Sequence, residues 1–254
     1  MSISELFSIQ GKKAVVTGAG RGIGKVLALA LAEAGCDVSL IDINVEDTVI
    51  VAADIEKMGC RTLALKADVT KAAEMKKTFD DVVREFGRLD ICVNSAGVCI
   101  NEAAEETTEE NYDQVVDTNL KGVFLCCQEA AKIMIPQKSG SIINIASMSG
   151  TVSNFPQKHA HYNASKAGVI LLSKCLAVEW APYSVRVNTL SPGYTKTELI
   201  SVSMHLWSQW EALIPMKRLA EPKELIGAVI YLASDASSYT TGSDIIVDGG
   251  YTAR

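Results

Sequence analysis

The stretch Thr17-Gly-Ala-Gly-Arg-Gly-Ile-Gly24 decides the fold of this 254-residue chain. Before it lies Lys13–Thr17, a short apolar run typical of a buried strand, and after it residues 25–34 have the spacing of an amphipathic helix. A glycine-rich turn between a strand and a helix is a place where open α/β sheets bind dinucleotides, because N–H groups at the helix N-terminus face the pyrophosphate. The stretch therefore predicts an α/β fold with such a site at its first turn.

Each glycine of this turn has an expected role. Gly18 permits the tight turn, Gly22 lets a pyrophosphate approach the backbone, and Gly24 allows the helix to pack closely on the strand. Arg21 and Ile23 complete the expected binding turn, and the Arg21 guanidinium would either serve a cofactor phosphate or form a surface salt bridge. The spacing Gly-x-x-x-Gly-x-Gly differs from the better-known Gly-x-Gly-x-x-Gly, so the turn needs support from elsewhere in the chain.

The alternation of short apolar runs with helical segments continues along the chain. Further strands are expected at 37–42, 62–67, 89–94, 141–146, 185–190 and 244–248, and helices near 46–57, 71–86, 108–135, 164–180 and 222–233. Strands that alternate with helices require a parallel sheet covered on both faces. No linker, repeat or shift in composition divides the sequence, so residues 1–254 are expected to form one doubly wound α/β domain.

Composition excludes several classes of function. The formal charge of −6, a pI near 5.2 and the lack of any basic block argue against a nucleic-acid partner. The sequence has no run of about eighteen apolar residues, so no membrane span is predicted, and the first ten residues do not resemble a secretory signal. The seven cysteines include no C-x-x-C, which favours free thiols in a reducing cytoplasm over disulfides or a metal site.

Asp42 ends the second expected strand, about eighteen residues after the glycine turn. A carboxylate at this position accepts hydrogen bonds from both ribose hydroxyls of an adenosine and repels a 2′-phosphate. Asp42 therefore favours NAD over NADP, although a guanidinium in the turn would act in the opposite direction.

Two further strand ends carry residues that suit a dinucleotide site. Asp68, followed by Val69, would accept from an adenine amino group or cap the helix expected at 71. Asn94-Ser-Ala-Gly97 ends the fourth strand with small residues, among them Ala96 and Gly97, that leave room for a ribose or a flat ring. All of these residues follow strands at their carboxyl ends, where open α/β sheets bind ligands.

The chemistry is expected at His161-Tyr-Asn-Ala-Ser-Lys166, at the start of a helix. Tyr162 and Lys166 are four residues apart and therefore share one helical face. A nearby ammonium favours the phenolate and would lower the pKa of Tyr162 toward the working range of a general base. If the Ser147 hydroxyl reaches the same point, the group can transfer a proton to or from an alcohol or carbonyl oxygen; otherwise the Tyr–Lys pair is an ordinary solvated one.

Together these residues resemble the short-chain dehydrogenase/reductase family over essentially the whole chain. The matching motifs are Thr17-Gly-x-x-x-Gly-x-Gly24, Asp68, Asn94-x-Ala-Gly97, Asn119, Ser147, Tyr162-x-x-x-Lys166 and Pro192-Gly193. The resemblance implies a Rossmann-like sheet of about seven strands, hydride transfer to or from a nicotinamide, and a homotetramer. The one departure is Ser95, where the family commonly has a second Asn.

The resemblance also assigns roles to individual residues. It implies that Tyr162 is the general acid/base, that Ser147 positions the substrate oxygen, and that Lys166 holds the nicotinamide ribose while lowering the pKa of the tyrosine. Asn119 would kink its helix and hold a water in the proton relay to Lys166. The residues expected along the nicotinamide side are Pro192, Gly193 and Thr195.

Within the family, the chain looks like the polyol dehydrogenases that interconvert sugar alcohols and ketoses. The segments that carry this likeness are 147–157, 177–181, 191–195, 214–218 and 247–251. Ser149, Asn154 and Gln157 lie between Ser147 and Tyr162 in the sequence, where polar side chains would bind further substrate hydroxyls. The nearby histidines, His159 and His161, would touch substrate or have ordinary loop roles.

The segment from Thr195 to Lys217 spaces Met and Trp side chains roughly as a helix does. It is either an amphipathic helix on the domain surface or, by the resemblance, a substrate lid that excludes water. Its aromatic residues would equally enclose an apolar substrate. The leading prediction is an NAD-dependent polyol dehydrogenase or ketose reductase; the alternatives are a 3-oxoacyl thioester reductase, a reductase of another small or apolar ketone, and a nucleotide-binding regulator without catalysis.

Overall fold

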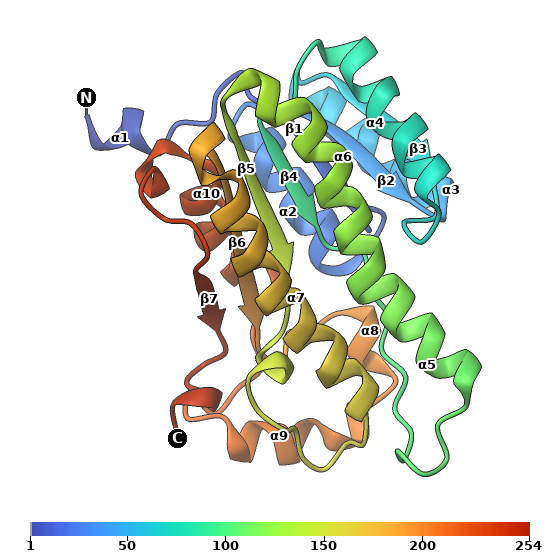
Figure 1. The fold of residues 1–254 in the computed structure, drawn as a ribbon. Coiled ribbons are helices and arrows are strands. Elements are labelled where there is room, and N and C mark those ends of the chain that lie inside the picture. Colours follow the sequence, from blue (N-terminus) through green and yellow to red (C-terminus); the bar gives the residue numbers. More distant parts are fainter. Residues whose placement is uncertain (1) are drawn as a thin grey trace.

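The computed structural model describes residues 2–254 and is built around one parallel sheet of seven strands (Figure 1). The strands are β1 (Lys13–Thr17), β2 (Asp37–Asp42), β3 (Thr62–Lys66), β4 (Ile91–Asn94), β5 (Gly140–Ile145), β6 (Val185–Pro192) and β7 (Asp244–Val247). Their order across the sheet is β3-β2-β1-β4-β5-β6-β7, and each neighbouring pair is parallel. The predicted doubly wound α/β fold of about seven strands is therefore confirmed.

Helices of different lengths lie before and between these strands. They are α1 (Ile3–Leu6), α2 (Gly22–Glu33), α3 (Val45–Lys57), α4 (Ala72–Phe86), α5 (Glu109–Val116), α6 (Gly122–Gln137), α7 (Ala160–Trp180), α8 (Glu198–Ser201), α9 (Trp207–Leu213) and α10 (Ile226–Ala233). One buried apolar cluster joins α2, α3 and α10 to the sheet, and a second joins α4, α6 and α7 to its other face. Alternate residues of a strand serve the two clusters, as Val15 and Val16 do, which is why the strands are apolar throughout.

Strand register brings the expected site residues to one edge of the sheet. Thr17, the last residue of β1, pairs with Ile41 of β2 and with Asn94 of β4. The Thr17 hydroxyl also accepts hydrogen bonds from the N–H groups of Ser95 and Ala96, which ties the glycine turn to the end of β4. Because all strands run in the same direction, the loops that follow them meet at this edge.

The glycine turn needs its glycines for two separate reasons. Gly18 and Gly22 have φ values of +64° and +56°, in the left-handed region that other residues rarely adopt. Gly24 instead lies against the turn itself, since a Cβ at this position would be 2.1 Å from the carbonyl oxygen of Gly18. The turn therefore fixes how closely α2 approaches β1, as the sequence predicted.

The segment predicted as one helix at 108–135 contains a short irregularity. Between α5 and α6, residues Asp117–Lys121 form a π-helical turn with Asn119 buried inside it. Such turns often occur at functional sites. The resemblance implied that Asn119 kinks its helix, and in the structure the helix is interrupted there by the π-helical turn.

The segment at 195–217 does not form a single amphipathic helix. It contains α8, a 3₁₀ turn at Met204–Leu206 and α9, which pack through a third apolar cluster that includes Met148, Tyr194 and Trp210. Figure 1 shows α8 and α9 beyond the ends of β5 and β6, beside the loop that leads into α7. Among residues 2–254, no helix is both long and apolar enough to cross a bilayer.

Candidate active site

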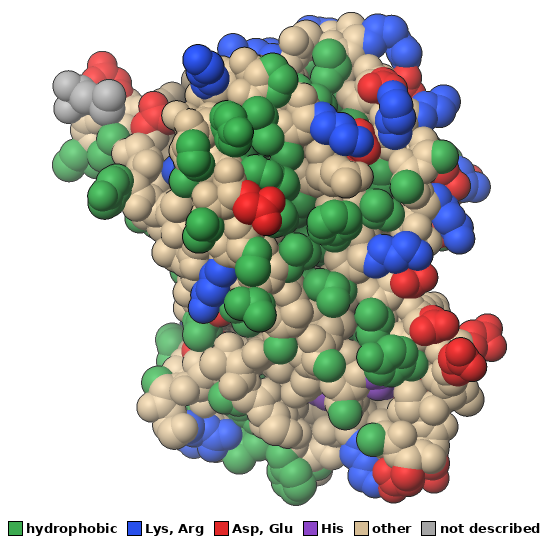
Figure 2. Space-filling model, viewed as in Figure 1, with side chains coloured by type: hydrophobic (Ala, Val, Ile, Leu, Met, Phe, Trp, Pro, Cys, Tyr) green, Lys and Arg blue, Asp and Glu red, His purple; other side chains and the backbone are tan. Residues whose placement is uncertain are grey.

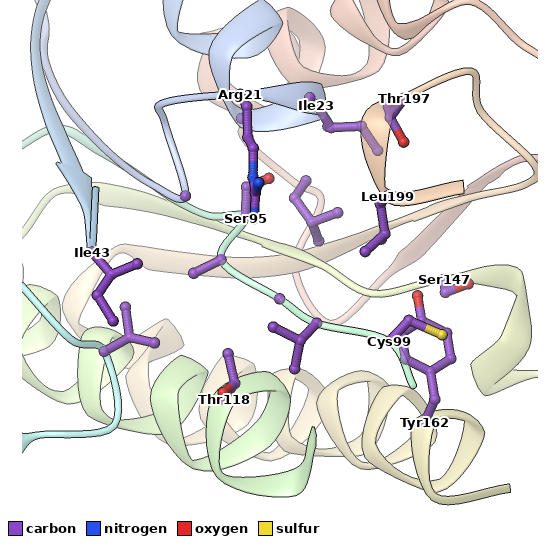
Figure 3. A pocket seen from close by; sticks show the side chains of 18 of the residues that line it. Arg21, Ile23, Ile43, Ser95, Cys99, Thr118, Ser147, Tyr162, Thr197 and Leu199 are labelled. Atoms are coloured by element: carbon purple, nitrogen blue, oxygen red, sulfur yellow. The ribbon is translucent and has the colours of Figure 1, made fainter. Parts of the chain in front are cut away.

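A cavity of about 980 Å³ opens at the carboxyl ends of the strands (Figure 3). This volume is at the upper end of the range for small-molecule sites, about 300–1,000 Å³. Its wall includes most of the predicted site residues: Gly18, Arg21, Gly22, Ile23, Gly24, Asp42, Asp68, Val69, Ala96, Gly97, Ser147, Tyr162, Lys166, Pro192, Gly193 and Thr195. The cavity thus brings together residues from the first glycine turn to the start of the 195–217 segment.

One end of the cavity has the features of a dinucleotide site. Helix α2 starts at Gly22 without a side-chain cap, which leaves its first N–H groups for a ligand phosphate. At the end of β2, the Asp42 carboxylate accepts hydrogen bonds from the backbone N–H groups of Gly20 at 3.0 Å and Asn44 at 3.1 Å. These bonds hold the carboxylate beside the turn, where an adenosine ribose would lie. The residues present therefore fit a nicotinamide dinucleotide.

Asp68 forms a local turn and does not cap the following helix. Its Oδ1 accepts from the backbone N–H of Thr70 at 2.9 Å and from the Thr70 hydroxyl at 2.8 Å. Helix α4 begins after Lys71 without a side-chain cap. The capping alternative is therefore wrong, and the predicted contact of Asp68 with an adenine stays a prediction.

Asn94 is in the core and does not line the cavity as the sequence suggested. Its side chain is 1% exposed, and its Nδ2 donates to Asn144 Oδ1 at 2.7 Å on the neighbouring strand. The Asn144 amide in turn donates to the Ser173 hydroxyl of α7 at 2.8 Å. Alternation along β4 points Asn94 toward the helices, so its amide joins β4, β5 and α7 beneath the site.

Asn119 connects the loop after β4 to α7. Its Oδ1 accepts from the N–H of Val98 at 2.8 Å, and its Nδ2 donates to the carbonyl of Val98 at 2.9 Å and to Ser165 Oγ at 3.1 Å. These bonds explain why a side chain with both a donor and an acceptor suits the π-helical turn. The expected water between Asn119 and Lys166 stays a prediction.

Ser147, Tyr162 and Lys166 meet at the other end of the cavity, as predicted, and Figure 3 shows Ser147 and Tyr162 there. The Ser147 hydroxyl follows β5 and hydrogen-bonds to the phenol of Tyr162 on the first turn of α7. The Lys166 ammonium lies 5.8 Å from the centre of the Tyr162 ring and donates to the carbonyl of Ile145 at 2.9 Å. The serine and the phenol are therefore in place to hold one substrate oxygen between them.

Burial controls the proton affinities of this group. It raises the pKa of Tyr162 above its usual value; the nearby Cys99 thiol acts in the same direction, and the bond from Ser147 acts against it. Burial also lowers the pKa of Lys166 to about 8. The predicted lowering of the tyrosine pKa by Lys166 is not found, because desolvation of the phenolate raises this pKa.

Several residues at this end of the cavity were not expected from the sequence. Cys99 lines the wall beside Tyr162, and Leu199, Ile200 and Val202 line it from α8 and the residue that follows. Burial raises the pKa of the Cys99 thiol to about 11, so the thiol is protonated at neutral pH. The sequence signal for Cys99 is its position two residues after Gly97, on the loop that leaves the end of β4.

The predicted substrate ligands of the 147–160 loop are bonded to other protein groups. The hydroxyl of Tyr194 accepts from Gln157 Nε2 at 2.6 Å and from Asn154 Nδ2 at 3.4 Å. The backbone N–H of Ser149 donates to Ser147 Oγ at 3.1 Å. Within the described part of the chain, none of Ser149, Asn154 and Gln157 lines the cavity, so their contact with substrate stays a prediction.

The two histidines near Tyr162 are both buried. His159 contacts Asn101 Oδ1 through Nδ1 at 3.1 Å and Asn154 Oδ1 through Nε2 at 3.3 Å, and its ring centre is 5.2 Å from that of Tyr162. Burial, followed by the charge of His161, lowers the pKa of His159 to about 4. His159 is therefore neutral at physiological pH and supports the loop as an uncharged group.

We expect His159 to destabilise the fold in acid. The unfolded chain binds a proton at His159 near pH 6.5, whereas the folded chain binds it only near pH 4, so stability falls as the pH drops through this window. The difference amounts to about 3 kcal/mol. In urea unfolding from pH 7.5 to 4, the free-energy difference between wild type and His159→Gln should change by this amount. His205→Gln, at an exposed position of the 195–217 segment, is the control; parallel wild-type and His159→Gln curves would contradict the prediction.

Comparison with known proteins agrees with this site. A family model described as enoyl-(acyl carrier protein) reductase matches residues 18–252. A crystal structure of a short-chain type dehydrogenase/reductase from Mycobacterium marinum superposes with a TM-score of 0.98 at 44% identity, and each chain is covered completely. The described elements therefore have the arrangement of a solved enzyme of this type from end to end.

Curated relatives include several proteins named for sugar alcohols or ketoses. A sorbose reductase of Candida albicans is 42% identical, over 99% of this chain and 90% of the relative. A probable NADP-dependent mannitol dehydrogenase of Yarrowia lipolytica is 44% identical, over 98% and 91%. An NADH-dependent L-xylulose reductase of Ambrosiozyma monospora is 40% identical, over 97% of each. These names share one chemistry, the interconversion of a hydroxyl and a carbonyl on a polyhydroxylated carbon chain.

Proposed function

Because this chain belongs to the short-chain dehydrogenase/reductase family, we propose that it is an NAD-dependent oxidoreductase of polyols. It would transfer a hydride between a secondary alcohol of a sugar alcohol and NAD, or reduce the corresponding ketose. The observation that carries the proposal is the meeting of the Ser147 hydroxyl and the Tyr162 phenol at the end of a cavity that begins at the glycine turn.

In the proposed reaction, the chain's own residues bind the substrate oxygen and move its proton. The Ser147 hydroxyl holds the oxygen, and the Tyr162 phenol donates a proton to it during reduction or accepts one during oxidation. The protonated phenol that burial favours is the form needed for reduction. Lys166 would bind the nicotinamide ribose and, when charged, favour the phenolate. The nicotinamide, when bound, supplies or accepts the hydride.

Asp42 supports NAD as the preferred cofactor. The names of the relatives include both NADP- and NADH-dependent enzymes, so they do not choose between the two. The Asp42 carboxylate is held beside the glycine turn by Gly20 and Asn44, and it would repel a 2′-phosphate. Arg21 on the same turn is the only opposing influence expected from the sequence.

Asp42→Asn should narrow the preference for NAD over NADP. The amide keeps one acceptor oxygen, so it retains one of the two backbone hydrogen bonds, and it removes the charge that repels the 2′-phosphate. We expect the ratio of kcat/KM for NAD to that for NADP to fall by about tenfold, corresponding to about 1.4 kcal/mol. Glu46→Gln removes an exposed charge nearby and should leave the ratio unchanged. An unchanged ratio in Asp42→Asn would show that Asp42 does not discriminate between the cofactors.

A substrate panel tests the reaction itself. Purified protein is mixed with NAD and a series of hexitols and pentitols, and reduced nicotinamide is followed by absorbance. Turnover of a polyol supports the proposal. Turnover of acetoacetyl thioesters instead would favour the second candidate, a 3-oxoacyl thioester reductase, for which the apolar wall at Leu199, Ile200 and Val202 is the specific supporting observation. Dinucleotide binding without any oxidation would favour a non-catalytic regulator.

We also propose that the protein assembles as a homotetramer. Figure 2 shows hydrophobic side chains scattered over the face formed by α6 and α7. On α7, the large apolar residues Leu171 and Val178 are 63% and 78% exposed. A second copy covering this face would bury them. Light scattering of the purified protein tests the assembly.

A further inference from the structure

We infer that Gln157 is a positioning residue that fastens the lid to the catalytic end of the chain. The lid is here the 195–217 segment, and the lid clamp is the set Gln157, Tyr194 and Trp210. The inference deepens the proposed oxidoreductase function, because the clamp would define the substrate end of the same cavity. It gives Gln157 a role different from direct contact with a substrate hydroxyl.

The amide of Gln157 is bonded at both ends to aromatic side chains. Its Nε2 donates to the Tyr194 hydroxyl at 2.6 Å, and its Oε1 accepts from the indole N–H of Trp210 at 3.0 Å. The two aromatic rings are stacked with centres 4.2 Å apart and planes 7° apart, and their residues are 8% and 3% exposed. The two rings therefore form a buried, closely packed stack, to which the half-buried Gln157 amide is bonded.

The clamp joins three segments that are distant in sequence. Gln157 lies in the loop five residues before Tyr162, Tyr194 lies between the cavity-lining residues Gly193 and Thr195, and Trp210 belongs to α9. Trp210 and Tyr194 also share an apolar cluster with Met148, the neighbour of Ser147. A shift of α9 would therefore be transmitted to both sides of the catalytic pair.

Glutamine suits this position because the clamp needs an acceptor toward the indole and a partner for the phenol. Leucine would leave the indole N–H of the buried Trp210 without this partner, which destabilises the clamp. Glutamate keeps an acceptor for the indole, and the Tyr194 hydroxyl can turn to donate to it. Gln157→Leu should therefore open the clamp, whereas Gln157→Glu should largely preserve it.

Steady-state kinetics of four variants test the clamp. Gln157→Leu and Trp210→Phe should each lower kcat/KM for the substrate by about 10- to 100-fold through misplacement of the lid, mostly by raising KM. The double variant should lose less than the product of the two single effects, because both single variants remove the bond between Gln157 and Trp210. Gln157→Glu should restore most of the activity. The dissociation constant for NADH, measured by fluorescence, should change less than about twofold.

Trp207→Phe is the matched control. Its indole packs against the cluster that contains Tyr194 and Trp210, but its N–H donates to the carbonyl of Ile200 at 3.4 Å and not to Gln157. Its kinetic constants should stay near wild type. If Trp210→Phe behaves like this control while Gln157→Leu loses activity only on particular polyols, Gln157 contacts a substrate hydroxyl directly and the clamp is wrong.

Hydrogen exchange separates failure of the clamp from failure of the proposed reaction. Mass spectrometry of the enzyme without substrate follows backbone exchange in residues 198–213. Gln157→Leu and Trp210→Phe should each speed this exchange by about tenfold, whereas exchange in the α7 peptides should not change. In Trp207→Phe, exchange in residues 198–213 should stay as in wild type. Unchanged lid exchange in both clamp variants would overturn the inference, whether or not a polyol is turned over. Absence of polyol turnover in wild type would overturn only the substrate assignment.

Discussion

Replacement of Tyr162 by phenylalanine is expected to reduce turnover by about 100- to 10,000-fold, the usual contribution of a positioned general acid or base. Phenylalanine fills the same buried space at the start of α7 but has no proton to exchange with the substrate oxygen. The Ser147 hydroxyl and the Lys166 ammonium remain, but neither occupies the position of the phenol, which lies next to both of them. Neither can therefore replace it as the proton donor. Initial rates with saturating NAD and the best substrate of the panel measure the loss.

Dinucleotide binding provides the control for this variant. The glycine turn and Asp42 lie at the opposite end of the cavity, so NADH titration by fluorescence should give a dissociation constant close to that of wild type. Tyr183→Phe, at an exposed position after α7, should leave both rate and binding unchanged. Full activity in Tyr162→Phe would contradict the proposed mechanism, although turnover of polyols would still support the proposed substrate class.

Gly24→Ala is expected to abolish dinucleotide binding and to destabilise the fold strongly. The added Cβ would lie 2.1 Å from the carbonyl oxygen of Gly18, a backbone atom that cannot move without opening the glycine turn. Overpacking commonly costs about 1–3 kcal/mol, and a clash with backbone places this variant at or above the upper end of that range. Urea unfolding measures the stability, and NADH titration measures the binding.

Gly227→Ala is the matched substitution for this test. Gly227 is on α10, no heavy atom lies within 4 Å of the position where its Cβ would be, and its φ is not positive. Alanine within a helix is more stable than glycine by about 0.5–1 kcal/mol, so this variant should gain stability and keep its binding. Equal stability of Gly24→Ala and wild type would show that the turn does not set the spacing of α2 and β1.

The fold could be predicted because its strands are short, apolar and separated by clear turns. Lys13–Thr17, followed by the glycine turn, matched the observed β1, and the strand expected at 62–67 was found at Thr62–Lys66. Residues whose position depends only on a strand end, such as Asp42 and Ser147, were therefore also placed correctly at the cavity. Backbone periodicity contains this information without knowledge of packing.

Partner choice among buried polar side chains could not be predicted in the same way. Gln157 bonds to Tyr194 and Trp210, which are 37 and 53 residues farther along the chain, and the lid position decides whether they meet. Asn94 faces the core because of the phase of β4, which a four-residue strand does not define from sequence. Polar residue types alone therefore suggested ligand contacts where the structure has internal bonds.

The strand order β3-β2-β1-β4-β5-β6-β7 has a consequence for how such enzymes can change. Loops after β1, β2 and β3 form the part of the wall where an adenosine would bind, whereas the loops from β4 onward and residues 195–202 form the wall near Ser147 and Tyr162. A chimera that exchanges only residues after β5 with those of a relative should inherit the donor's choice of sugar while retaining the recipient's coenzyme preference. Substrate preference and coenzyme preference can therefore change independently of each other in this fold.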